Sequence, residues 1–134
     1  MTLIMWDDPT CQLGLIEMDE THREFVDLVN KLADAKGCDF ENLFQVLVEH
    51  TRQHFAREKE WMEQSGFPAI SAHEDEYQRI LGELNQYKRK VSKGAISFAR
   101  GYVSGVLPDW FKLHIATMDS ALAFHLKQRE VIEA

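Results

Sequence analysis

The chain has 134 residues, of which 45% are hydrophobic and 28% are charged; this balance indicates one globular domain and excludes a disordered or collagen-like chain. The 22 acidic residues outnumber the 15 basic residues, and the net charge of −7 argues against nucleic acids and anionic membranes as partners. No apolar run approaches the roughly 20 residues that cross a bilayer, and the N-terminus lacks the pattern of a signal peptide. We therefore expect a single cytoplasmic domain over residues 1–134, with Cys11 and Cys38 as ordinary thiols.

Glycine and proline are sparse, and the long segments between them repeat apolar residues at helical spacing rather than alternating them as a strand does. Residues 1–18 lack such a period and are predicted to form an ordered arm, with Trp6, Leu15 and Ile16 packed on the rest of the chain. The periodicity predicts helices over four ranges: residues 19–36, 40–64, 71–92 and 96–127. Because short loops join these amphipathic helices, we predict an all-α fold, an up-down-up-down antiparallel four-helix bundle with an N-terminal arm.

Capping residues predict where the helices begin and end. Asp19 is a suitable N-cap for the first helix, and Gly37 is a suitable stop after it. The third helix is expected to begin at a capping box formed by Ser71 and Glu74. Pro108 lies inside the fourth range, so we expect a kink or an interruption there.

Every predicted helix carries at least one titratable side chain on its apolar stripe. His54 and Glu58 are four residues apart and share a helix face, whereas His114 and Asp119 are five apart and diverge by about 140° on an α-helix. One such residue alone is most simply an edge residue that reaches water, but several in one core need partners. The set comprises His22, His54, Glu58, His73, His114 and Asp119.

A metal centre would satisfy all of these groups at once. Imidazole with carboxylate suits iron, zinc or manganese, and the lack of cysteine in the set argues against a structural zinc site. Two carboxylates also allow bridging between two metal ions. Trp61 and Trp110 lie on the same stripes and are candidates for the walls of a dry pocket, while His125, near the end of the fourth helix, is expected to be structural.

The order and spacing of these residues resemble the hemerythrins, and the bacteriohemerythrins in particular. The matching pattern is His22, then His54-Phe55-x-x-Glu58, then His73, then His114-Ile115-x-x-x-Asp119. The neighbouring Gly66-Phe67-Pro68 and Trp110 are similar as well, and the resemblance covers nearly the whole chain. It implies a non-haem diiron centre, with an oxo or hydroxo bridge from solvent, that binds O2 reversibly at one iron.

By this resemblance the iron with the open position takes His22 and His54, the other iron takes His73 and His114, and the bridging carboxylates are Glu58 and Asp119. The family pattern on the third helix is His-x-x-x-His, but here Tyr77 stands in the second place, so one imidazole of the second iron is missing. Three alternatives stay open. Tyr77 binds as a phenolate, which favours Fe(III) over reversible O2 binding; Tyr77 stays neutral and hydrogen-bonds nearby, which leaves an open position; or His50, one turn before His54, replaces the missing ligand.

The leading hypothesis is a protein that binds O2 for storage, delivery or sensing at a diiron centre modified by Tyr77. The ligand would be O2 or a related small diatomic molecule or peroxide. The alternative is a diiron redox enzyme that acts on peroxide, nitric oxide or O2 through the same centre. A third hypothesis is a degenerate bundle with an incomplete or single-metal site, which the metal content would distinguish.

Overall fold

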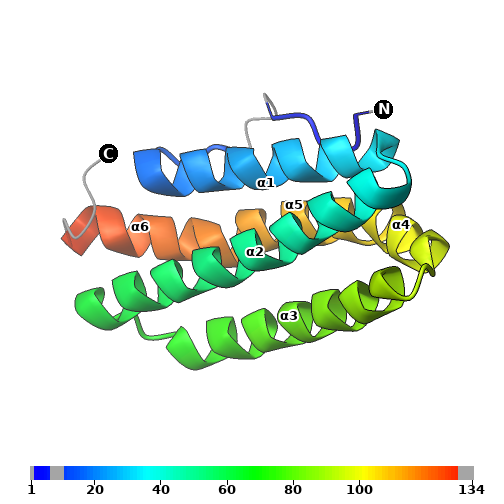
Figure 1. The fold of residues 1–134 in the computed structure, drawn as a ribbon. Helices are drawn as coiled ribbons and strands as arrows, with labels where there is room; N and C mark the ends of the chain where they lie inside the picture. Colours follow the sequence, from blue (N-terminus) through cyan, green and yellow to red (C-terminus); the bar gives the residue numbers. More distant parts are fainter. Residues whose placement is uncertain (1, 7–10, 130–134) are drawn as a thin grey trace.

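The computed structural model of the chain describes residues 2–6 and 11–129. Within these ranges the regular structure is helical, as predicted, and four helical rods lie side by side (Figure 1). The fourth rod is built from several consecutive segments. The rods are α1 (Ile16–Asp34), α2 (Gly37–Ser65), α3 (Ile70–Ser92) and the series α4 (Ile96–Gly105), α5 (Leu107–His114), the π-helix η2 (Ile115–Asp119) and α6 (Ser120–Arg129).

Consecutive rods run in opposite directions, which confirms the predicted antiparallel four-helix bundle (Figure 1). α2 contacts both α1 and α3, and α4 contacts both α1 and α3 where the chain returns. Connections of two to four residues between the rods leave no room for a crossover, so each helix folds back on the one before it. None of the described helices is both long enough and apolar enough to cross a membrane.

The first helix begins at Ile16, before the predicted N-cap Asp19, so that expectation is wrong. The Asp19 carboxylate instead accepts hydrogen bonds from the backbone N–H groups of Leu13 (2.8 Å) and Gly14 (3.0 Å) in the arm. Gly14 has a φ of 83°, a left-handed conformation that glycine adopts without steric strain. Asp19 therefore stabilises the junction between arm and helix from within the first turn of α1.

Two further end signals are wrong. Gly37 does not stop the first helix but starts the second: α1 ends at Asp34, and Gly37, with a φ of 55°, is the first residue of α2. The predicted capping box does not form, because α3 begins at Ile70 without a side-chain cap. Glu74 of that predicted box instead pairs with Lys59 of α2 at 3.3 Å.

The expected interruption of the fourth rod is confirmed. α4 ends before Val106, and Pro108 lies in the first turn of α5, where a missing backbone N–H breaks no helical hydrogen bond. The fourth rod can therefore change direction without losing its packing on the other three.

One amide side chain anchors the first described residues of the N-terminal arm. Asn30 of α1 bonds to the backbone N–H (3.0 Å) and C=O (2.9 Å) of Ile4, which is buried. Leu15 is buried and Trp6 is partly buried against the core, as predicted, whereas Ile16 is 58% exposed, so its predicted packing is wrong. The part of the arm between residues 7 and 10 lies outside the described residues.

The bundle interior is apolar except in the half nearer the α2–α3 connection, where polar side chains are buried among the rings and aliphatic groups. Burying such groups is unfavourable unless each is hydrogen-bonded, paired or bound to a metal. The buried polar residues of the described chain are His22, Thr51, Glu58, Ser65, His73, His114 and Asp119. All of them except Thr51 and Ser65 belong to the predicted ligand set.

Candidate metal centre

Each of the four rods contributes to one polar cluster in the bundle interior, because the helical stripes that carry these residues all face inward. Apart from His54, whose side chain is 10% exposed, the residues are buried. The predicted ligands come from α1 (His22), α2 (His54 and Glu58), α3 (His73 and Tyr77), α5 (His114) and η2 (Asp119).

Four of these side chains form a compact group, which we call the four-donor group: His22, His54, Glu58 and Asp119. One ligand atom from each lies within 4.8 Å of the others. The His54 Nε2 atom is 2.9 Å from Glu58 Oε2, and the His22 Nε2 atom is 3.0 Å from Asp119 Oδ2. Two imidazoles and two carboxylates at this spacing are a donor set that suits iron, manganese or zinc.

The π-helix η2 brings His114 and Asp119 together. On an α-helix these two residues would point about 140° apart. A π-helical turn closes with an i→i+5 hydrogen bond and therefore places residue i+5 above residue i. As a result, His114 Nε2 lies 3.1 Å from Asp119 Oδ1, while the other Asp119 oxygen faces His22.

The buried atoms of this cluster fit a metal ion. Both ring nitrogens of His22 and His114, both oxygens of Asp119 and Glu58 Oε2 are buried without a partner in hydrogen-bond geometry. The short approaches between these atoms therefore lack the geometry of good hydrogen bonds. Unsatisfied buried groups are rare and costly in folded proteins, and a cation among them would satisfy several at once.

The carboxylates control the charge of this cluster. Burial alone would lower the pKa of His54 and of His114, but Glu58 beside the first and Asp119 beside the second raise them above the usual histidine value. Burial alone would raise the pKa of Asp119, but His114 and His22 hold it well below its usual range. Without a metal ion, protons on the imidazoles balance the carboxylates, and a cation would displace those protons.

Tyr77 and His73 of α3 are engaged elsewhere. The Tyr77 hydroxyl donates a hydrogen bond to Glu58 Oε1, and its ring stacks on Phe55 at 4.0 Å. Burial and the nearby Glu58 carboxylate raise the pKa of Tyr77. His73 has Nδ1 3.1 Å from the carbonyl of Ala69 and Nε2 3.2 Å from the carbonyl of Met118. Metal binding by either residue stays a prediction, and the contacts favour the alternative with a neutral Tyr77.

The two remaining histidines lie outside the four-donor group. His50 Nε2 is 3.2 Å from Glu24 Oε1 on the outer side of α1 and α2, and burial lowers its pKa despite that carboxylate. The alternative in which His50 replaces the missing ligand therefore gains no support. His125 Nε2 lies 3.0 Å from the carbonyl of Ser65 and ties α6 to the end of α2, in keeping with its predicted structural role.

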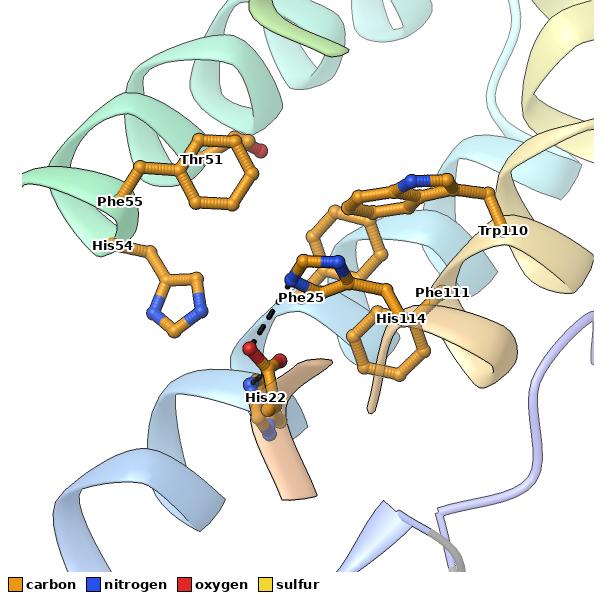
Figure 2. A pocket seen from close by; sticks show the side chains of 9 residues that line it. His22, Phe25, Thr51, His54, Phe55, Trp110, Phe111 and His114 are labelled. Atoms are coloured by element: carbon orange, nitrogen blue, oxygen red, sulfur yellow. Dashed lines mark ion pairs between the residues drawn. The ribbon is translucent and has the colours of Figure 1, made fainter. Parts of the chain in front are cut away.

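A small cavity adjoins the four-donor group. The centre of a water molecule can occupy about 10 Å³ of this cavity, and that volume is roughly enough for one water. Figure 2 shows His22, His54 and His114 on its walls among aromatic rings, with Phe111 edge-on to His22 at 5.7 Å and Trp110 stacked on His114 at 4.9 Å. The cavity is therefore apolar on one side and lined by metal-binding groups on the other.

The sequence of the chain matches known proteins across this region. The family profile described as "Hemerythrin HHE cation binding domain" matches residues 13–123. The chain belongs to the hemerythrin family. It is 33% identical over 129 residues to a bacteriohemerythrin of Ralstonia nicotianae, with 96% of this chain and 93% of that protein covered. It is 27% identical to a hemerythrin of Sipunculus nudus, with 86% of this chain and 87% of that protein covered.

The hemerythrin fold is confirmed by solved structures. A crystal structure of a hemerythrin mutant matches with a TM-score of 0.78 at 24% identity, covering 94% of this chain and 98% of that one. Hemerythrins typically bind non-haem iron, and the four-donor group gives this member a site of suitable chemistry.

Some residues that line the cavity cannot be recognised as lining residues from the sequence. Phe25 and Phe111 line the cavity, but their apolar spacing marks them only as core residues. The available signal is that each is three residues from a predicted ligand and so shares its helix face. Trp110 lines the cavity as predicted and donates its indole N–H to Glu76 (2.6 Å), while Trp61 is not among the lining residues.

Proposed function

We propose that this hemerythrin-family chain binds O2 reversibly at a carboxylate-bridged diiron centre, and stores, delivers or senses O2 in the cytoplasm. Two ferrous ions, when bound, would supply the electrons that hold O2 reversibly. The iron beside the cavity would be held by His22 and His54. The other iron would be held by His73 and His114. The carboxylates of Glu58 and Asp119 would bridge the two.

The observation that carries this proposal is the cavity on the four-donor group. Its volume is roughly that needed by one water molecule, which suits a small ligand better than a large organic substrate. Histidines line one side, so a ligand in the cavity lies next to the proposed open iron position. The small volume favours a small molecule such as O2 over a large organic substrate, and the reversibility of binding separates O2 binding from redox chemistry on peroxide or nitric oxide.

The aromatic residues would protect the bound ligand. Phe111 stacks on Phe25 at 4.6 Å and meets His22 edge-on, so these apolar rings cover one side of the cavity. On the same aromatic side Trp110 packs against Phe25, with ring centroids 6.4 Å apart, donates a hydrogen bond to Glu76 and covers the His114 ring. Excluding water and protons slows the loss of iron-bound ligands to side reactions, which reversible binding requires.

The proposal is tested by loading the metal-free protein with ferrous iron under anaerobic conditions. We expect about two irons per chain, a visible absorption spectrum that forms on exposure to O2, and its disappearance when O2 is removed, over repeated cycles. A spectrum that forms once and does not reverse would instead support the redox-enzyme alternative. A chain that binds no iron would refute the proposal.

A matched pair of histidine variants sharpens this test. His54→Gln removes one imidazole of the four-donor group, whereas His125→Gln removes a partly buried imidazole that bonds to the carbonyl of Ser65. We expect the first variant to lose iron and the O2-dependent spectrum, and the second to keep both. Equal loss in the two variants would assign the effect to folding rather than to ligation.

A further inference from the structure

The Tyr77 hydroxyl donates a hydrogen bond to Glu58, the carboxylate that lies between the two proposed metal positions. We propose that the two metal positions of this chain differ strongly in affinity: the four-donor group fills first, and the position beside His73 and His114 fills second and weakly. In this arrangement Tyr77 acts as a hydrogen-bond donor to Glu58 rather than as a metal ligand. The inference rests on the proposed diiron centre and specifies how that centre is loaded.

The first position is already assembled. The ligand atoms of the four-donor group lie within 4.8 Å of one another, and they come from three different elements that the bundle holds in place. The Oε2 atom of Glu58 faces His54 at 2.9 Å and His22 at 3.9 Å. A cation entering this group therefore requires little rearrangement.

The second position lacks donors that are ready to bind. Glu58 has its other oxygen, Oε1, on that side, and this oxygen already accepts a hydrogen bond from the Tyr77 hydroxyl. His114 and Asp119 Oδ1 are available as a pair 3.1 Å apart. His73 lies with both ring nitrogens against backbone carbonyls, so it must give up its contact with Met118 before it can bind a cation.

The packing of Tyr77 keeps it in this role. Its ring is stacked on Phe55 with the planes only 12° apart, and the side chain is buried, so the hydroxyl has little freedom to turn away from Glu58. The second cation would then have fewer protein ligands than the first. Loss of an outer-shell partner of a metal ligand already lowers affinity about 10- to 100-fold, and loss of a ligand itself costs at least as much, so we expect a gap of about 100-fold between the two steps.

The test is an anaerobic titration of the metal-free chain with Co(II), followed by absorption and by metal analysis after desalting. We expect two binding steps, with one tightly held ion per chain after desalting. Tyr77→His adds an imidazole on the side of the second position and should tighten the second step by at least 10-fold. Tyr77→Phe removes the proton donor without adding a ligand, and it should leave the second step unchanged or slightly tighter.

Tyr102→Phe is the matched control. Tyr102 of α4 donates to Glu83 of α3 at 2.8 Å, and neither residue belongs to the four-donor group, so this variant removes a similar tyrosine–glutamate bond elsewhere in the bundle. We expect its titration to equal that of the parent. Circular dichroism of each variant confirms that the bundle is folded before the titrations are compared.

The outcomes separate the inference from the proposed function. Two steps of equal affinity, a second step weakened by Tyr77→Phe, or a strong phenolate-to-iron band in the air-oxidised iron protein would overturn the inference and leave the diiron proposal intact. A chain that binds no metal ion would overturn both. Two unequal steps whose gap closes in Tyr77→His would establish the inference.

Discussion

Replacement of Glu58 by glutamine tests whether this buried carboxylate serves metal binding or only folding. Glu58 is fully buried, accepts a hydrogen bond from the Tyr77 hydroxyl at Oε1 and faces His54 at Oε2. Glutamine has nearly the same shape, and its carboxamide oxygen still accepts a hydrogen bond from Tyr77. It removes the negative charge, however, and with it an anionic ligand of the four-donor group. We therefore expect the metal-free protein to keep its fold and the metal-loaded protein to lose most of its extra stability.

The magnitude follows from mass action. An ion present at about 1,000 times its dissociation constant stabilises the folded state by about 4.1 kcal/mol. For a chain of 134 residues, an unfolding entropy of about 2.1 cal/mol/K per residue makes that equal to a rise of about 15 °C in Tm. If Glu58→Gln lowers affinity about 100-fold, the same ion concentration raises Tm by only about 5 °C.

The assay is thermal unfolding by circular dichroism with and without Co(II), at one fixed ion concentration. Glu83→Gln is the control, because Glu83 also accepts a hydrogen bond from a tyrosine but lies outside the four-donor group. A Tm rise on metal addition that is equal in Glu58→Gln and in the parent would refute the assignment of Glu58 as a ligand.

Three further predictions concern the protein around the centre. Trp110→Phe removes the indole donor to Glu76, a bond to a charged group, and should lower the free energy of unfolding by about 1.5 kcal/mol in urea titrations; an unchanged midpoint would contradict it. Phe111→Ala opens the cavity beside His22 and should cost about 3–5 kcal/mol in the same assay, whereas a loss below about 1 kcal/mol would mean that the wall collapses to fill the space. The metal-free protein should also be less stable at pH 9 than at pH 6. The pKa values of His54 and His114 are raised in the folded state. The contribution of these two residues to stability is therefore fully present below the unfolded pKa of about 6.5, and it is lost as pH rises through the folded-state pKa values. A Tm that increases between pH 6 and pH 9 would contradict this expectation.

The bundle and the direction of its polar residues could be predicted from the sequence because both follow from helical spacing. The ends of the helices could not. Asp19 has the side chain of an N-cap, but its carboxylate accepts hydrogen bonds from the N–H groups of Leu13 and Gly14 instead of capping the helix. Gly37 has the left-handed φ typical of a helix stop, yet the two-residue connection puts that conformation at the start of α2.

The π-helix is the part of the site that could not be predicted by assuming α-helical spacing. His114 and Asp119 both point inward, and on an α-helix two residues five apart cannot share one narrow face. The conflict between these two observations is itself the signal for a wider turn. The contact between Tyr77 and Glu58 leaves no comparable signal, since it depends on how far α2 and α3 are shifted along each other, which periodicity does not fix.

The four-donor group spans most of the polypeptide, from His22 on α1 to Asp119 on η2. A ribosome releases the chain from its N-terminus, so Asp119 emerges only after the five helices α1 to α5 have been made. In zinc fingers the ligands are close in sequence and the ion itself drives folding. The donors of the four-donor group are spread over α1, α2 and η2, so an ion could contact all four only after these elements have packed together. We therefore expect such an ion to complete its coordination late in folding, rather than to organise the growing chain.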